Sequence, residues 1–227
     1  MARLKLGVLL SGRGSNLQAL IAASNDPAYP ATIVSVITDR AEAPALAYAR
    51  AAGIPDVAIP HRDRAFFAAE AGGLLREHRV ELVCLAGFMR VLDAAFVESW
   101  HDRMVNIHPS LLPAFPGLHP QRQALAAGVR FTGCTLHFVR SEVDAGPIIA
   151  QAVVPTLPGD DEASLSARIL KVEHRLYPAV VRLIAEGRVR VIAGKVEIDG
   201  WQAPKIAALN PRAARREPSV RGVGDRL

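Results

Sequence analysis

Three polar side chains whose types suit acyl-transfer chemistry follow apolar, strand-like runs in this sequence. Asn106 and His108 lie in the segment MVNIHPSLLPAFPG, and Asp144 lies in the segment VDAGP further along the chain. An amide donates hydrogen bonds, an imidazole can carry a proton near neutral pH, and a carboxylate can hold that imidazole in its protonated form. We therefore expect Asn106, His108 and Asp144 to be the catalytic residues.

This set of side chains suits the direct attack of an amine on a carbonyl, without a covalent enzyme intermediate. The attack leaves an oxyanion, which an amide and a charged imidazole can stabilise. It also leaves an ammonium, whose excess proton a carboxylate can accept directly or through water. Each residue has a structural alternative: His108 as a loop histidine, Asn106 as the cap of the turn that follows it, and Asp144 as an ordinary Asx turn.

The composition indicates one globular domain. The chain has 227 residues, of which 50% are hydrophobic and 22% are charged, and this suffices for a real core. No apolar run is long enough to span a membrane. The apolar run at the start covers only residues 6–10 and indicates a buried strand rather than a signal peptide. Cys84 and Cys134 lie in strand-like runs, so we expect buried, reduced thiols and a cytoplasmic protein.

The basic charge of the chain is concentrated at its end. The formal net charge is +5 and the isoelectric point is 9.7. Residues 205–227 hold six basic and two acidic residues, which gives +4 of that +5. The nearly neutral remainder does not interleave basic and aromatic residues as a nucleic-acid platform does. We expect a domain at residues 1–204, a disordered basic tail at residues 205–227, and small molecules as partners rather than nucleic acid or a membrane.

Apolar runs that alternate with helical patterns predict an α/β fold. Continuous apolar runs predict strands buried on both faces at residues 4–10, 33–38, 57–60, 82–86 and 104–107. Helical patterns separate them at residues 15–24, 44–52, 63–78 and 93–100. This alternation predicts right-handed βαβ units and a single-domain, Rossmann-like, doubly wound and mostly parallel sheet.

The second half of the chain is expected to complete this sheet with antiparallel strands. The predicted elements are a short helix at residues 121–127, longer strands at 133–140 and 147–154, a long covering helix at 162–186, and a hairpin at 189–192 and 195–198. Ligands of open α/β sheets bind beyond the carboxyl ends of the strands. One crevice is therefore expected to collect the loops that follow residues 10, 85 and 105.

The segment SGRGSN, residues 11–16, links the first expected strand to the first expected helix. Glycines let the backbone there turn its N–H groups toward an anion, and the helix dipole adds to the attraction. We expect Gly14, Ser15 and Asn16 to hold a single phosphate group. The structural alternative is a glycine turn in which Ser15 or Asn16 caps the helix.

A dinucleotide is a poorer fit to the same segment. Gly12 and Gly14 match the first two glycines of the dinucleotide-binding fingerprint, but Leu17 occupies the third glycine position. Asp39 ends the second strand at a suitable distance for a ribose, yet the segment also lacks the lysine of a P-loop. A non-catalytic nucleotide-binding module would need only this segment, and it would have no use for His108 or Asp144.

The chain resembles the phosphoribosylglycinamide formyltransferase family in NIHPSLLPAFPG, in LAGFMRVL and in HFVRSEVDAGPIIAQ. The family comprises folate-dependent enzymes of purine synthesis, and the resemblance covers about residues 4–200. It implies the formyltransferase fold and transfer of the formyl group of 10-formyltetrahydrofolate to the amine of 5'-phosphoribosylglycinamide. No metal is implied, and the histidines and cysteines lack metal-ligand spacing. Oligomeric state stays open between a monomer and a homodimer.

The resemblance also implies a folate pocket. Its expected residues are Arg64, Met89, Arg90, Val91, Leu92, Asn106, Arg140, Ser141, Glu142, Val143 and Asp144. A pterin needs a flat apolar slot with backbone hydrogen bonds, and its anionic glutamyl tail favours a nearby arginine. The structural alternatives are core packing for the apolar residues and a solvated helix face for Arg64.

Glu173, in LKVEHRLYP, resembles the family carboxylate that grips the glycinamide portion of the substrate, and the alternative is a surface glutamate. The chain departs from the family pattern at Arg13, where many relatives carry a smaller polar residue, and at Gln121, where several carry a histidine. The first change could strengthen phosphate binding. The second removes a histidine from the loop, although His119 matches the pattern.

Two rival activities share the expected fold. A methionyl-tRNA formyltransferase would need a second, tRNA-contacting domain, whereas this chain ends soon after its long helix. A formyltetrahydrofolate hydrolase usually carries an additional N-terminal regulatory domain, whereas the expected strands begin at Leu4. The sequence therefore favours transfer of the formyl group to phosphoribosylglycinamide.

Overall fold

The computed structural model describes residues 2–60, 63–200, 202 and 210. Of the tail expected at residues 205–227, only Asn210 is among them, so the expectation of a disordered tail lies outside the described residues. The strands are β1 (Leu4–Leu10), β2 (Ala31–Thr38), β3 (Asp56–Ala58), β4 (Leu82–Leu85), β5 (Met104–His108), β6 (Phe131–Phe138), β7 (Ile148–Pro155), β8 (Val189–Ile192) and β9 (Lys195–Ile198). The helices are α1 (Ser15–Ser24), α2 (Ala45–Ala51), α3 (Arg64–Glu77), α4 (Ala94–Ser99), α5 (Pro120–Ala126) and α6 (Glu162–Ala185).

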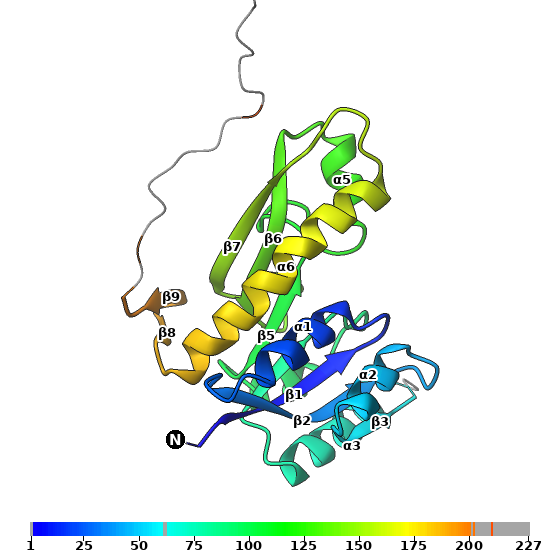
Figure 1. Cartoon of the computed structure of the whole chain (residues 1–227), viewed down its shortest axis with the longest axis vertical. Helices are drawn as coiled ribbons and strands as arrows, with labels where there is room; N and C mark the ends of the chain where they lie inside the picture. The colour runs from blue at the N-terminus through cyan, green and yellow to red at the C-terminus, as the bar shows by residue number, and fades with distance from the viewer. Residues whose placement is uncertain (1, 61–62, 201, 203–209, 211–227) are drawn as a thin grey trace, which may run out of the picture.

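The described residues form a seven-stranded sheet with the order β3-β2-β1-β4-β5-β6-β7 and a separate β8-β9 hairpin (Figure 1). The neighbours from β3 to β5 are parallel, and β6 and β7 are antiparallel to their neighbours. The predicted doubly wound, mostly parallel sheet with antiparallel C-terminal strands is confirmed. Predicted and observed element bounds differ by at most two residues.

Two apolar layers hold the sheet between its helices. On one face, β-sheet residues pack against α1, α2 and α6, with Leu17, Leu46 and Ile169 among the buried contacts. On the other face, Phe67 of α3 and Phe96 of α4 join the second layer. The central strands are therefore buried on both faces, which explains their continuous apolar runs. None of the described helices has the length and apolar character needed to cross a membrane.

Helix α6 is connected to the ends of the two strands that carry the site. The buried hydroxyl of Tyr177 donates hydrogen bonds to the carbonyl of Leu85 at 3.0 Å and to the carbonyl of Val105 at 3.4 Å. Leu85 ends β4, and Val105 precedes Asn106 in β5. This helix begins at a capping box in which Asp161 and Ser164 bond each other's backbone N–H groups. The cap fixes where α6 starts, and Tyr177 fixes how it lies over the strand ends.

The pairing of β6 with β7 leaves no room for a side chain at Gly133. A Cβ atom at this position would overlap the carbonyl oxygen of Ala152 in β7. We expect Gly133→Ala to lower the free energy of unfolding by about 1–3 kcal/mol, because the two backbones would have to separate. The control is Gly73→Ala in α3, where nothing lies within 4 Å of the added atom. This control should gain roughly 0.5–1 kcal/mol from helix propensity. Denaturant unfolding of both variants measures the difference, and equal stabilities would contradict the predicted clash.

Candidate active site

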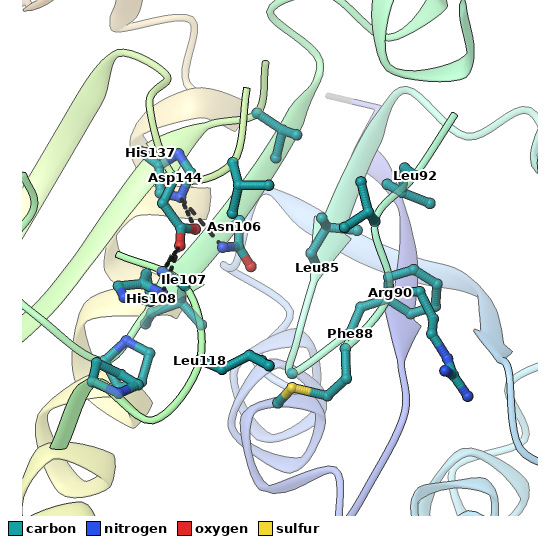
Figure 2. A pocket seen from close by; sticks show the side chains of 18 of the residues that line it. Leu85, Phe88, Arg90, Leu92, Asn106, Ile107, His108, Leu118, His137 and Asp144 are labelled. Carbon is teal, nitrogen blue, oxygen red and sulfur yellow. Dashed lines mark hydrogen bonds and ion pairs between the residues drawn. The ribbon is translucent and has the colours of Figure 1, made fainter. Parts of the chain in front are cut away.

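A cavity of about 540 Å³ opens at the ends of β4 and β5. Its wall comes from the loop after β4, from the segment between β5 and the start of α5, and from the loop between β6 and β7. Figure 2 shows the polar side chains of Asn106, His108, His137 and Asp144 together on one side of this cavity. The other side is largely apolar, with Phe88 and Leu92. The cavity therefore combines an apolar slot with one concentrated polar end.

Asp144 lies at the centre of the polar end, with only 9% of its side chain exposed. Its Oδ2 accepts a hydrogen bond from the backbone N–H of Gly117 at 2.8 Å and lies 3.3 Å from Nδ1 of His108. Its Oδ1 lies 3.7 Å from Nε2 of His137. The carboxylate thus contacts β6 and also the more distant segment that holds His108 and Gly117, so Asp144 is more than the local Asx turn of the alternative interpretation.

His108 has two different partners for its two ring nitrogens. Nε2 lies 2.9 Å from the carbonyl oxygen of Phe115, which can only accept, so this nitrogen carries a hydrogen. Nδ1 faces Asp144 and donates to it only when the ring carries a second hydrogen. The two groups can form an ion pair only when the imidazole is protonated. The ring lies at the polar end of the cavity, with 7% of its side chain exposed.

His137 is a site residue that the sequence did not single out. It lies directly opposite Asn106 in the antiparallel pairing of β5 and β6, and its Nε2 is 3.3 Å from Nδ2 of Asn106. Its Nδ1 donates to the carbonyl of Phe138 at 2.9 Å. Burial lowers the pKa of His137, more than Asp144 and the Phe138 carbonyl raise it. The neutral ring therefore has its lone pair on Nε2 and accepts a hydrogen bond from the Asn106 amide.

This hydrogen bond orients the Asn106 side chain. One N–H of the amide is directed at His137, and the second remains for a ligand in the cavity. The sequence contains only an indirect indication that His137 belongs to the site. Side chains alternate along the antiparallel strand, but position 137 can be placed opposite position 106 only when the register of the two strands is known. The structure thus brings together all three predicted catalytic residues and adds His137 between Asn106 and Asp144.

Most of the residues expected in a folate pocket lie on the cavity wall. These are Met89, Arg90, Val91, Leu92, Asn106, Arg140, Ser141, Glu142, Val143 and Asp144. Met89 and Val143 keep 63% and 53% of their surface exposed, which is unusual for apolar residues and leaves them free to contact a ligand. Arg64 is the exception, because it lies exposed at the first residue of α3 and is not on this wall.

Gly14 is the N-cap of α1, with a left-handed φ of 78°. A Cβ atom there would lie 2.5 Å from the Cβ of Ala45, so only glycine fits. Neither Ser15 nor Asn16 caps the helix through its side chain, so the capping alternative is wrong. The first backbone N–H groups of α1 consequently keep their capacity to bind an anion.

Asn16 and Glu173 form a buried pair beside this helix start. They are 7% and 5% exposed, and Nδ2 of Asn16 donates to Oε2 of Glu173 at 2.7 Å. The surface-glutamate alternative for Glu173 is therefore wrong. Burial raises the pKa of Glu173, while the hydrogen bond from Asn16 acts in the opposite direction. Oδ1 of Asn16 is buried without a partner and can accept a hydrogen bond from a ligand.

The phosphate-binding candidates adjoin the cavity without lining it. Gly14, Ser15, Asn16 and Glu173 are absent from the cavity wall. The connection runs through Ser11, whose backbone N–H donates to the carbonyl of Gly87 at 3.1 Å and whose hydroxyl accepts from the Met89 N–H at 2.9 Å. The expected single crevice is thus two adjoining regions, with Ser11 holding the loop after β1 to the loop after β4.

His119, the N-cap of α5, and Gln121, in its first turn, also line the cavity. The side chain of His119 is 60% exposed, and its Nδ1 lies 3.6 Å from Oε1 of Glu162. Its ring therefore lies beside Glu162, the first residue of α6. Within the described residues, no three histidine, cysteine or acidic side chains are grouped so as to hold a metal ion. The expectation that the reaction uses no metal stays a prediction.

Comparison with known proteins gives one family for almost the whole described chain. Residues 4–181 match the family model described as formyl transferase. The phosphoribosylglycinamide formyltransferase of Escherichia coli K12 is 42% identical over 200 residues, which cover 87% of this chain and 94% of that protein. The structure of glycinamide ribonucleotide transformylase 1 from Symbiobacterium toebii is 46% identical, with a TM-score of 0.84, and the match covers 86% of this chain and 94% of the other.

A longer relative contains the same region as one part. The trifunctional purine biosynthetic protein adenosine-3 of Drosophila melanogaster is 52% identical over 190 residues, which cover 82% of this chain. The match spans only 14% of that protein's length. The similarity therefore concerns one segment of this relative, and it says nothing about the activities of the rest of that protein.

The buried Glu173 generates a test of stability against pH. In the unfolded chain Glu173 ionises above about pH 4.5. In the folded protein its pKa is raised, so ionising Glu173 above that pH costs free energy and destabilises the folded state. The glutamate's contribution to stability is therefore largest below that pH and falls as the pH rises through the folded pKa. Glu173→Gln should raise the melting temperature at pH 8 relative to the natural protein, and this gain should vanish at pH 4.

The control for this substitution is Glu70→Gln, at an exposed position on α3. The control should leave the melting temperature nearly unchanged at both pH values. Thermal unfolding at several pH values gives the comparison. If Glu173→Gln changed the melting temperature equally at pH 4 and pH 8, ionisation of the buried Glu173 would not lower the stability of the folded protein, and the prediction would be wrong.

Proposed function

This chain belongs to the formyl transferase family, and we propose that it transfers the formyl group of 10-formyltetrahydrofolate to the amine of 5'-phosphoribosylglycinamide during purine nucleotide synthesis. The observation that supports this most strongly is the position of Asp144. Its buried carboxylate lies between His108 and His137 at the polar end of an apolar cavity, with the Asn106 amide beside it. This arrangement offers hydrogen-bond donors, a positive charge and a proton acceptor around one point.

The formyl donor supplies a carbonyl carbon that an amine can attack directly. The oxyanion of the resulting tetrahedral state needs donors, and the free N–H of Asn106 is one of them. In the proposed reaction His108 is protonated beside Asp144, and its positive charge supplies the second contribution. For His108 to donate a hydrogen bond as well, its Nε2–H has to turn from the carbonyl of Phe115 to the ligand.

The amine that attacks becomes an ammonium and must lose one proton. Asp144 is the acidic group at the polar end of the cavity, and its Oδ1 is bonded less tightly than its Oδ2. We assign the removal of this proton to Asp144, directly or through a water molecule. His108 then returns a proton to the departing nitrogen of the folate. Because His137 is neutral and holds Asn106 in place, its role is to position the amide.

The apolar wall suits the flat pterin of the donor. Phe88, Leu92 and Val139 supply apolar surface, and the loop that contains Ser141 to Asp144 supplies backbone hydrogen-bonding groups beside it. Arg64 was expected to contact the glutamyl tail, and its exposed position at the start of α3 leaves that contact a prediction. The cavity volume of about 540 Å³ lies in the range of small-molecule sites.

The ribonucleotide would occupy the adjoining region. Its phosphate suits the open N-terminus of α1 at Gly14, Ser15 and Asn16, where backbone N–H groups and the helix dipole attract an anion. The buried pair of Asn16 and Glu173 offers acceptors for hydroxyl or amine hydrogens of the same ligand. Ser11 joins the loop after β1 to the loop after β4 on the cavity wall, and in this proposal the amine end extends from the start of α1 to the polar end of the cavity.

The cellular setting is part of the same proposal. Both cysteines are free and buried, which suits the reducing cytoplasm, and we place the reaction there. The partners are the two small-molecule substrates, without nucleic acid or a membrane. Each site is built from residues of a single chain, so a monomer suffices for the chemistry, and a homodimer is equally compatible with it.

One assay separates the proposed reaction from its rivals. Purified protein is incubated with 10-formyltetrahydrofolate and either phosphoribosylglycinamide, charged initiator tRNA or water alone, and formylated product and free formate are measured. We expect formylation of phosphoribosylglycinamide only. Formate release at the same rate without an acceptor would identify a hydrolase, and formylation of the tRNA would identify the other transferase.

The role of His108 can be tested by truncation. His108→Ala should lower turnover by roughly 10²–10⁴, as expected for a positioned group that transfers protons. The Michaelis constants should change much less, because the apolar wall and the N-terminus of α1 remain. The matched control is His101→Ala, an exposed histidine near Glu98 that does not line the cavity. The control should keep normal turnover, and near-normal turnover of His108→Ala would remove this residue from the mechanism.

A further inference from the structure

A buried carboxylate lies beneath one edge of the cavity, outside the groups used in the proposed reaction. Asp39 follows the last residue of β2, and its side chain is 0% exposed. Its Oδ2 lies 2.8 Å from Nε of Arg90, whose side chain is 44% exposed and lines the cavity. Oδ1 of Asp39 has no hydrogen-bond partner. Arg90 is therefore bound from inside the protein through Nε alone.

This one-point contact leaves the end of the guanidinium available. Within the described part of the chain, Arg90 bonds no other side chain, so its Nη groups can still donate to a ligand. Its charge, however, is balanced by Asp39 from within the protein. The other arginine on the cavity wall, Arg140, is likewise paired with an aspartate, Asp102. Neither arginine on this wall presents an uncompensated positive charge.

The position of Arg90 relates it to one end of the formyl donor, and here the inference rests on the proposed function. Figure 2 shows Arg90 on the opposite side of the cavity from His108 and Asp144. With the formyl group at the polar end, the anionic glutamyl tail extends away from it. Arg90 is the arginine on the wall at that distant side. A carboxylate bound to its Nη groups would also experience the negative charge of Asp39 behind the guanidinium.

We infer that Asp39 is a specificity-determining residue: it is a buried counter-ion that cancels the charge of Arg90 and weakens the attraction of the cavity for the anionic tail of the formyl donor. Coulombic repulsion between two carboxylates on either side of one guanidinium persists because Asp39 is shielded from water. The tail is then recognised by directed hydrogen bonds more than by net charge. Affinity for the donor consequently depends weakly on salt.

Asp39→Asn isolates the charge, because asparagine keeps the size of the side chain and an oxygen that can accept from Nε of Arg90. The test compares 10-formyltetrahydrofolate with the primary amide of 10-formyltetrahydropteroate, in which a neutral amide replaces the anionic glutamyl group. At low ionic strength, Asp39→Asn should lower the Michaelis constant for the glutamylated donor by roughly three- to tenfold. The constant for the neutral pteroate amide and both turnover numbers should stay within about twofold of the natural protein. High salt should remove most of the gain.

Two further variants separate this effect from a general disturbance. In an Arg90→Gln background, Asp39→Asn should give no additional change, because the charge that it releases is gone. Asp56→Asn removes the carboxylate from another aspartate–arginine pair, with Arg50 at 3.0 Å, that is not on the cavity wall. This control should leave both Michaelis constants unchanged. Melting temperatures confirm that each variant is folded.

Several results would overturn the inference. A higher Michaelis constant for the glutamylated donor in Asp39→Asn would mean that the carboxylate is needed to hold Arg90 in place. An equal change for both donors, no change in either, or a change that persists in the Arg90→Gln background would also contradict it. Absence of formyl transfer by the natural protein with either donor would instead refute the proposed function, so the two failures are distinguishable.

Discussion

The carboxylate of Asp144 is the interaction on which the candidate site depends. A nearly buried negative charge is costly unless it is hydrogen-bonded and paired, and Asp144 meets that requirement with the N–H of Gly117 and the ring of His108. These partners come from the end of β5 and the segment after it, whereas Asp144 comes from the loop after β6. Satisfying one charge therefore holds two loops against each other. The same contact holds the ring of His108 at the polar end of the cavity.

The sheet supplies the precision that these contacts need. Asn106 and His137 face each other because β5 and β6 are antiparallel with a fixed register, and a slip of one residue would send one of them to the opposite face. Burial keeps His137 neutral, which lets its ring accept from the amide of Asn106. Tyr177 then binds α6 to the carbonyls that precede the site in both β4 and β5. Backbone pairing thus orients side chains whose chemistry requires fixed directions.

Both arginines on the cavity wall and the ring of His108 lie beside an aspartate. His108 is paired with Asp144, Arg90 with Asp39, and Arg140 with Asp102. The adjoining region differs, since Asn16 keeps an unpaired buried oxygen and the first turn of α1 has no side-chain cap. An unpaired acceptor and free helix N–H groups therefore lie where the ribonucleotide is proposed to bind. The apolar slot can then accept a flat ligand without attracting anions indiscriminately.

The sequence by itself determined the sheet and most of the site. Continuous apolar runs predicted β1 to β5, because strands buried on both faces need apolar residues at every position. Residue types and local order identified Asn106, His108, Asp144 and the glycine turn at Gly14. The tertiary structure alone decided which groups meet: His137 beside Asn106, Asn16 on Glu173, and Arg90 over Asp39. The tertiary structure also decided that Arg64 does not line the cavity. The physical reason is that these pairs are 31, 157 and 51 residues apart, so strand order and register create them, and local periodicity carries no information about either.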